Sequence, residues 1–170
     1  MILVREVTAD DWELLRDVRL AALSDAPSAF ASTYAREAAF TQDQWHGRIG
    51  GRSVTFFAQE EPGNPVPADG APANRVPAGL AGVYVEDRAA DLVSMWVRPS
   101  ARGLGVGEVL VEAAAAWAKA HDFGALFLWV TESNEPARRL YERCGFSPTG
   151  ESQPLPSNPA LTEIQMSRAW

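Results

Sequence analysis

The sequence predicts one α/β domain over residues 1–170, because apolar runs of strand length alternate with helical patterns along the chain. The run Leu92–Val97 precedes three glycines in five positions and then a helical pattern, and the run Ala125–Val130 precedes a short helix that stops at Gly145. Continuous apolar runs of this length are typical of buried strands. A chain of 170 residues is long enough to bury one sizeable core.

The N-terminal part is predicted to contain a strand, two helical stretches and a second strand. Thr8 is expected to cap the first helix, with Asp11 three residues on as its capping-box partner. Thr41 is expected to interrupt the second helical stretch with a new cap. The predicted ranges are Ile2–Val7, Thr8–Ser24, Ser32–Ile49 and Ser53–Gln59.

The segment Glu61–Pro77 holds five prolines and two glycines, which is typical of a loop. Two interpretations remain open for it: an insertion without a function, and a flap beside a substrate mouth. Further strands are expected after this loop, and the Pro-rich stretch Ser152–Pro159 is expected to precede the last of them. These strands are predicted at Ala78–Glu86, Asp91–Val97, Ala125–Val130, from Phe146 onward, and at about Leu161–Ser167.

The run Arg102-Gly103-Leu104-Gly105-Val106-Gly107 joins a strand to a helix and predicts a phosphate-binding loop. Glycines permit positive φ and close approach of a ligand to the backbone, and the free N–H groups at a helix start favour an anion. The helix that follows is expected to bury one apolar face, formed by Val106, Val109, Leu110, Ala113 and Trp117.

The glycine run fits two nucleotide-binding motifs less well. A nucleotide-binding P-loop requires Gly-Lys-Ser/Thr, whereas the only lysine of the chain is Lys119. In a dinucleotide-binding fingerprint the third glycine would fall on Glu108 or Leu110, although Glu132 could serve as the ribose-binding acid. A tight turn needed only for helix packing also stays open at this point.

A second motif follows the strand Ala125–Val130. Asn134 is placed to cap a short helix with Pro136 in its first turn. Gly145 suits a left-handed cap at the helix end, and Phe146 begins another strand. The helix carries Ala137, Leu140 and Tyr141 on one stripe.

With these two motifs the chain resembles the GCN5-related N-acetyltransferase (GNAT) family. The family's central signature, Gln/Arg-x-x-Gly-x-Gly/Ala, is matched by Arg102, Gly105 and Gly107, and its later Asn, Ala, Tyr and Gly-Phe pattern is matched from Asn134 to Phe146. The resemblance implies a GNAT fold, with a mixed, mostly antiparallel sheet of six or seven strands and about four flanking helices. It also implies acetyl transfer from acetyl-CoA, as co-substrate, to a primary amine of a small molecule or peptide.

The resemblance implies where the co-substrate binds. The strand that begins at Asp91 is expected to bulge and to diverge from its neighbour, so that backbone groups of Met95 and Val97 pair with the pantetheine arm. The remaining candidate cofactor-binding residues are those of the glycine loop, Arg102, Gly103, Leu104, Gly105, Val106 and Gly107, together with Asn134 and Arg138.

Two candidate catalytic residues follow. Tyr141 matches the family's tyrosine near the cofactor sulfur, and a phenol stays protonated at neutral pH and can protonate a departing thiolate. Asp91 is the candidate base that deprotonates the amine, at a position where several family members carry glutamate. Glu86, Asp87 and ordered water are the alternatives to Asp91.

Composition indicates which classes of binding partner and which cellular location to expect. The formal net charge of −7 disfavours a nucleic-acid partner, and the sequence has no apolar stretch long enough for a membrane span. The single Cys144 fits a reducing cytoplasm, and the isolated His46 and His121 do not suggest a metal site. A monomer or a homodimer is expected. The alternative functions are a non-catalytic acyl-CoA sensor of the same fold and, less favoured, a dinucleotide-binding oxidoreductase.

Overall fold

The computed structural model describes residues 1–61 and 76–170, which form one seven-stranded sheet with helices on both faces. The predicted loop Glu61–Pro77 falls almost wholly on residues 62–75, outside the described residues. In chain order the elements are β1 Ile2–Glu6, α1 Trp12–Asp25, α2 Tyr34–Ala38, α3 Gln42–His46, β2 Ser53–Glu60, β3 Gly79–Glu86, β4 Ala89–Val97, α4 Val106–Ala120, β5 Ala125–Thr131, α5 Glu135–Arg143, β6 Ser147–Leu155 and β7 Asn158–Ala169.

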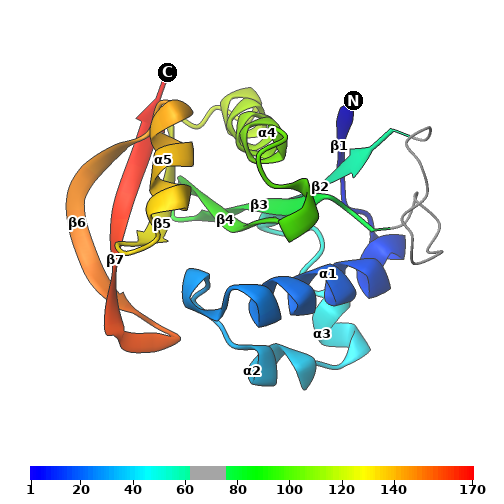
Figure 1. Cartoon of the computed structure of the whole chain (residues 1–170). Coiled ribbons are helices and arrows are strands. Elements are labelled where there is room, and N and C mark those ends of the chain that lie inside the picture. The colour runs from blue at the N-terminus through cyan, green and yellow to red at the C-terminus, as the bar shows by residue number, and fades with distance from the viewer. Residues whose placement is uncertain (62–75) are drawn as a thin grey trace.

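The sheet has the strand order β1-β2-β3-β4-β5-β7-β6. All neighbouring strands run antiparallel except β4 and β5, which are parallel. In Figure 1, α4 and α5 cover one face of the sheet and α1, α2 and α3 cover the other. The mixed, mostly antiparallel sheet confirms the fold expected from the resemblance, and its order differs from that of a doubly wound dinucleotide-binding sheet.

The strands β4 and β5 stay together over only three residue pairs. Ala90, Asp91 and Leu92 pair with Leu126, Phe127 and Leu128, and no pair is formed beyond them along the two described strands. On its other side β4 remains paired with β3 to Val97. The expected divergence of these two strands is therefore present, and it opens the sheet in its middle.

A bulge accompanies this divergence. The β3–β4 register shifts between Leu80 and Gly82, so that Ser94 and Met95 together stand opposite one residue of β3. Ser94 adopts a left-handed backbone with φ of 57°, which is uncommon for a residue with a side chain. Such a bulge re-aims side chains beside a site.

Among residues 1–61 and 76–170, the structure has one α-helix more than the sequence predicts. The stretch Ser32–Ile49 forms two short helices, α2 and α3, because Thr41 caps the second one: its N–H donates to Gln44 Oε1 at 2.8 Å, and its hydroxyl accepts from the Gln44 N–H at 3.3 Å. The new cap expected at Thr41 is thus confirmed. The described helices include none long and apolar enough to cross a bilayer.

Two sequence predictions need correction at the C-terminal end and in α4. The Pro-rich stretch Ser152–Pro159, expected to precede the last strand, instead belongs largely to strands: β6 continues through Ser152 to Leu155, and β7 begins at Asn158. Proline is tolerated in β6 because this strand lies at the edge of the sheet. In α4 Val109 is exposed. The buried face of this helix consists largely of small side chains, so α4 packs close to β3. The approach is close enough that a Cβ at Gly79 of β3 would lie only 2.8 Å from Leu110 Cδ1. The buried residues of α4 are Val106, Gly107, Leu110, Val111, Ala114, Ala115 and Ala118.

Two hydrophobic clusters hold the helices to the sheet. One joins α4 to β3, β4 and β5, with Leu110, Leu126 and Leu128 fully buried in it. The other joins α1 to the opposite face, around Leu23 and Phe57.

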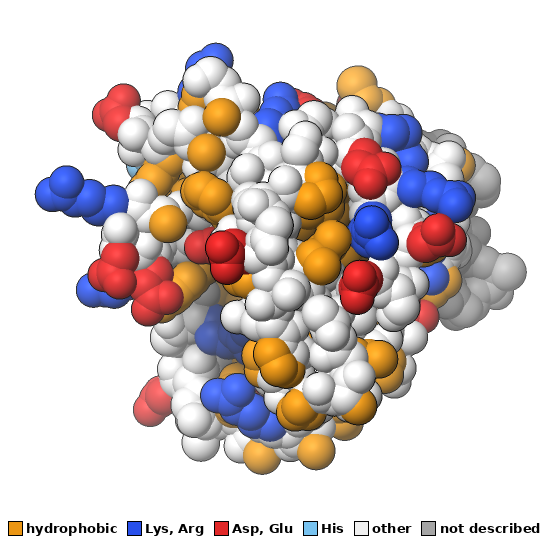
Figure 2. Space-filling view, turned by 90° about the vertical axis from the view of Figure 1, so that its left-hand side faces the viewer, with side chains coloured by type: hydrophobic (Ala, Val, Ile, Leu, Met, Phe, Trp, Pro, Cys, Tyr) orange, Lys and Arg blue, Asp and Glu red, His pale blue; other side chains and the backbone are white. Residues whose placement is uncertain are grey.

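Figure 2, which views the molecule from the side of β6, shows charges of both signs interspersed with apolar side chains on that surface.

The start of α1 is tied to β1 by an ion pair. Arg5 donates two hydrogen bonds to the Asp11 carboxylate, at 2.8 and 2.9 Å, and the Thr8 N–H donates to Asp11 Oδ2 at 2.8 Å. These bonds, with that from Arg5 foremost, lower the pKa of Asp11 to about 2. The depressed pKa means that the pair stabilises the fold above about pH 4 and loses this effect as the pH falls towards 2.

We expect Asp11→Asn to lower the free energy of unfolding at pH 7 by about 1 kcal/mol, a value reduced for the partial exposure of Arg5. The difference from the parent should shrink between pH 5 and pH 3, because Asp11 of the unfolded parent chain, with its ordinary pKa of about 4, takes up a proton there while the folded carboxylate remains ionised. Denaturant unfolding at pH 7, 5 and 3 measures this. Asp17→Asn, at an exposed position of α1, is the control, and a difference that is constant with pH would contradict the assignment.

Candidate functional site

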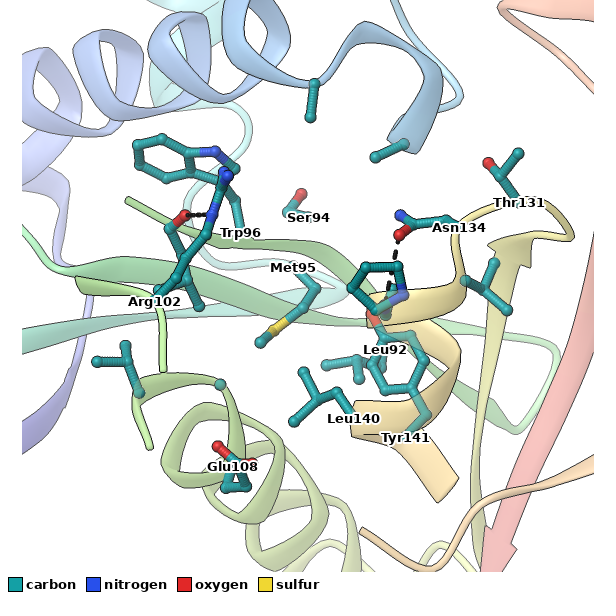
Figure 3. Close-up of a pocket in the computed structure, with 18 of the residues that line it drawn as sticks. Leu92, Ser94, Met95, Trp96, Arg102, Glu108, Thr131, Asn134, Leu140 and Tyr141 are labelled. Carbon is teal, nitrogen blue, oxygen red and sulfur yellow. Dashed lines mark hydrogen bonds between the residues drawn. The ribbon is translucent and has the colours of Figure 1, made fainter. Parts of the chain in front are cut away.

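The divergence of β4 and β5 produces a cavity of about 630 Å³. Figure 3 shows Met95 from β4 and Leu140 and Tyr141 from α5 pointing into the same space, with Arg102 and Trp96 at one end and Asn134 and Thr131 at the other. The glycine loop and the first turn of α4 complete the wall. Both sequence motifs therefore border one cavity.

The glycine loop has the backbone that its composition predicts. Gly103 and Gly105 have φ of 76° and 81°, and a Cβ at either would meet nothing within 4 Å. Gly105 is the N-cap of α4, so the free N–H groups of that helix begin here. The open space beside a helix N-terminus fits an anionic group such as a phosphate.

Gly107 differs from these two glycines. It is buried in the first turn of α4, and a Cβ there would lie 2.9 Å from Leu140 Cδ2. This glycine lets α4 and α5 approach each other closely, which is a packing role that the sequence motif alone does not reveal. Leu104, by contrast, is 63% exposed and does not line the cavity, unlike the other five residues of the loop.

The Arg102 side chain is anchored to protein groups. Its guanidinium pairs with Asp25 at the end of α1, and its Nε donates to the Val97 carbonyl at 3.0 Å. Trp96 Nε1 donates to the same aspartate at 3.0 Å. The Trp96 hydrogen bond, followed by the contact with Arg102, lowers the pKa of Asp25. Sequence reasoning missed Asp25, which lies 77 positions before Arg102 and has no motif of its own.

The two positions expected on β4 to pair with the co-substrate both line the cavity. Met95 follows the bulge residue Ser94, and Val97 ends the strand. The Val97 carbonyl already accepts from Arg102. The Ser94 hydroxyl accepts a hydrogen bond from Arg19 Nη1 at 3.3 Å, so α1 supports the bulge from the other face of the sheet.

The second motif forms as expected. Asn134 Oδ1 accepts from the Ala137 N–H at 3.3 Å and caps α5, while Gly145 ends the helix with φ of 88°. Asn134 lines the cavity, whereas Arg138 does not: its Nη1 donates to the Glu132 carbonyl at 3.0 Å. The structure thus brings Asn134 to the cavity and holds the Arg138 side chain against the β5–α5 connection.

Tyr141 is buried on the inner side of α5 and borders the cavity. Burial raises the pKa of its phenol above the ordinary value, so the hydroxyl keeps its proton at neutral pH. Among the residues that the structure describes, this hydroxyl has no hydrogen-bond partner. The group is therefore a protonated donor facing the cavity.

A second cavity of about 640 Å³ lies against the sheet face covered by α1 and α3. It shares with the first cavity residues of β4, of β5 and of the α1–α2 connection. The shared residues are Ala29, Phe30, Leu92, Val93, Ser94 and Trp129. The two cavities meet at the β4 bulge. Two ligands that react with each other require such a junction between their binding sites.

Asp91 lines this second cavity and not the first. It is half-buried on β4, and burial, with a smaller effect of Glu86, raises the pKa of its carboxyl. Glu86 lines the same cavity, whereas Asp87 sits in the β3–β4 turn with φ of 46° and lines neither cavity. Of the three acidic candidates, the structure brings Asp91 and Glu86 together and leaves Asp87 outside.

A buried ionic cluster supports the helical wall of the second cavity. Glu37 of α2, only 1% exposed, accepts two hydrogen bonds from Arg19 of α1, at 2.9 and 3.0 Å, and pairs with Arg48 at 2.7 Å. Its two arginine partners lower the pKa of Glu37 despite the opposing effect of burial. Sequence reasoning missed this cluster, because a lone glutamate in a short polar helix gives no signal of burial.

Metal binding has no support in residues 1–61 and 76–170, where no group of three or more His, Cys, Asp or Glu side chains could hold a metal ion. The sequence expectation of a metal-free site stays a prediction.

Comparison with known proteins identifies similar chains. Residues 19–146 match the acetyltransferase (GNAT) family. The chain is 47% identical over 51 residues to mycothiol acetyltransferase of Thermomonospora curvata, covering 30% of this chain and 17% of that protein. It is 45% identical over 51 residues to streptothricin acetyltransferase of Streptomyces lavendulae, covering 30% and 27%. The matched segments thus span less than a third of either curated relative.

Among solved structures, the fold is similar to a GCN5-related N-acetyltransferase from Kribbella flavida. The TM-score is 0.73 and the identity 24%, with 99% of this chain and 98% of that chain covered. At this identity the likeness shows the fold alone.

We expect Gly105→Ala to weaken coenzyme A binding about tenfold or more, because the added Cβ enters the open space at the helix start and disfavours the left-handed backbone. Calorimetric titration with coenzyme A measures the affinity. The matched control is Gly150→Ala in β6, which has the same strain, with φ of 96° and open space around it. Equal affinities in the two variants would exclude a binding role for the loop.

Proposed function

The chain belongs to the acetyltransferase (GNAT) family, and on that premise we propose that it transfers an acetyl group from acetyl-CoA to a primary amine. The amine attacks directly while both substrates are bound. The observation that carries this proposal is the meeting of two cavities at the β4 bulge, one bordered by the glycine loop and the other by Asp91. Substrates in separate cavities can react only where these cavities join.

The first cavity fits the co-substrate. Gly103 and Gly105 leave open space beside the N-terminus of α4 for the pyrophosphate, and β4 offers backbone groups at Met95 and Val97 beside the gap left by β5. Asn134 fixes the far wall by capping α5. Acetyl-CoA, when bound, supplies a thioester carbonyl for the amine to attack and a thiolate that departs.

Asp91 is the proposed base. An amine must lose a proton before it can attack, and a carboxylate whose pKa is raised accepts that proton more readily than an ordinary one. The raised pKa of Asp91 follows from its burial and from Glu86. Aspartate is one methylene shorter than the glutamate of several family members, so we propose that the proton passes through a water molecule.

Tyr141 is the proposed acid. Its buried, protonated phenol borders the first cavity, and proton donation at that point stabilises a sulfur atom that gains negative charge. The acceptor is proposed to be a primary amine of a small molecule or peptide. Cytoplasmic location and a monomeric or homodimeric state remain predictions.

The test of the proposal is thiol release from acetyl-CoA in the presence of a panel of primary amines, with mass spectrometry of the products. Amine-dependent release with an acetylated product supports the transferase. Coenzyme A binding without release for any amine would favour the sensor alternative.

We expect Tyr141→Phe to reduce kcat by about 10²–10⁴-fold, the usual range for one general acid. Coenzyme A affinity should change much less, because the hydroxyl acts when sulfur carries charge. Steady-state kinetics and a thermal melt of the variant measure both effects. A kcat close to that of the parent would rule out the acid role, and a raised KM with intact kcat would indicate a role in seating the co-substrate.

We expect Asp91→Asn to lower kcat/KM and to remove or shift the acidic limb of its pH profile. In the parent that limb should lie above the ordinary aspartate pKa of about 4, because the pKa of Asp91 is raised. The variant should be at least as stable as the parent at pH 7, since it removes a charge that burial disfavours. Asp87→Asn in the nearby turn is the control, and a pH profile of Asp91→Asn that overlays the parent's would refute the assignment.

A further inference from the structure

The second cavity holds a buried carboxylate that neither motif identifies. Glu163 of β7 is 5% exposed and lines this cavity. Its Oε1 accepts a hydrogen bond from Gln153 Nε2 of β6 at 2.6 Å. Within the described parts of the chain it forms no ion pair with an arginine or lysine. A buried carboxylate without a cation is unfavourable, and a bound cation would relieve this.

Strand register places Glu163 and Asp91 on the same face of the sheet. Asp91 pairs with Phe127 across β4 and β5, and Glu163 pairs with Thr131 across β7 and β5. Phe127 and Thr131 are four residues apart on β5, so their side chains point to the same face. Trp129 lies between them on that face and also lines the cavity.

The spacing of the two carboxylates follows from sheet dimensions. Four residues along β5 correspond to roughly 13 Å, and two strand spacings to about 10 Å. The two Cα atoms are therefore on the order of 16 Å apart. An extended chain of six carbons between two nitrogens spans about 9 Å. An ammonium–carboxylate hydrogen bond to Glu163 adds about 3 Å, and the water between the reacting amine and Asp91 adds about 5 Å, so a diamine of this length matches the spacing of the two carboxylates.

The arginines of this cavity do not balance its carboxylates. Arg19 and Arg48 line the helical wall, but both are paired with Glu37. Glu37 neutralises only one of these two arginines, so the other offsets one of the three carboxylates Asp91, Glu86 and Glu163, and the cavity keeps an excess of negative charge. A cation is favoured in such a cavity, and a second cation is favoured at a fixed distance from the first.

We infer that the acceptor is an aliphatic diamine or triamine, with one amine beside Asp91, its methylene chain over Trp129 and a second ammonium held by Glu163 and Gln153. This inference rests on the proposed acetyl transfer and names its substrate class. Glu163 is a specificity-determining residue in this arrangement, because it contacts the end of the acceptor that does not react.

The test compares 1,6-diaminohexane with n-hexylamine, which has the same chain and one ammonium. Both are titrated calorimetrically into the protein saturated with coenzyme A, and both are assayed as acetyl acceptors. The parent should bind the diamine about 10- to 100-fold more tightly, as a charged hydrogen bond in a buried site implies. Glu163→Gln should bring this ratio close to one, while Glu151→Gln, at an exposed position of β6, should keep it.

Each outcome decides between the inference and the function it rests on. Equal binding of the two amines by the parent, no binding of either, or an unchanged ratio in Glu163→Gln overturns the diamine site. Acetylation of amines without a preference for the diamine leaves the transferase intact and overturns the inference. A diamine preference that Glu163→Gln abolishes, without acetylation of any amine, supports the diamine site and overturns the transferase.

Discussion

The site depends on one constraint of strand pairing: β4 must stay bonded to β3 while it leaves β5. Backbone N–H and C=O groups within a sheet normally find partners on both sides, and those of β4 beyond Leu92 lack the partners that β5 would supply. The bulge at Ser94 and the cavity follow from this divergence. The exposed backbone is also the feature that can accept another extended chain, such as a pantetheine arm, as an additional strand.

The helices on the two faces keep this gap open. On one face, the absence of a side chain at Gly107 lets Leu140 of α5 pack against α4, which fixes Tyr141 beside the gap. On the other face, Arg19 joins Glu37 to the bulge residue Ser94. Removing one member of a buried ion pair leaves an uncompensated charge, so the cluster holds α1, α2 and β4 in one arrangement.

Sequence reasoning located the parts of the fold that local chemistry determines. The strand-loop-helix unit at Gly105, the caps at Thr41 and Asn134 and the turn at Gly145 each depend on residues a few positions apart, and the structure has them where predicted. The edge position of β6 and the alanine face of α4 depend on neighbouring strands, so the sequence pattern misplaced them.

In the candidate site, likewise, the residues that lie within local sequence motifs were predictable and the others were not. Tyr141, Asn134 and the glycines lie within motifs and border the first cavity. Asp25, Glu37 and Glu163 are held by contacts with residues distant in the chain, and acidic side chains usually indicate solvent exposure. A single sequence gives no signal for a carboxylate that tertiary structure buries.

The short connection between α1 and α2 links what happens in one cavity to the shape of the other. Ala29 and Phe30 form part of the wall of both cavities, and the segment is fastened to β5, where Thr131 donates to the Ser28 carbonyl, and to the turn after β6, where Ser157 donates to the Phe30 carbonyl. A ligand that displaces this wall from one side changes the shape offered to the other. Under the proposed acetyl transfer, binding of the two substrates is then thermodynamically linked, and by reciprocity each alters the affinity of the other by the same factor.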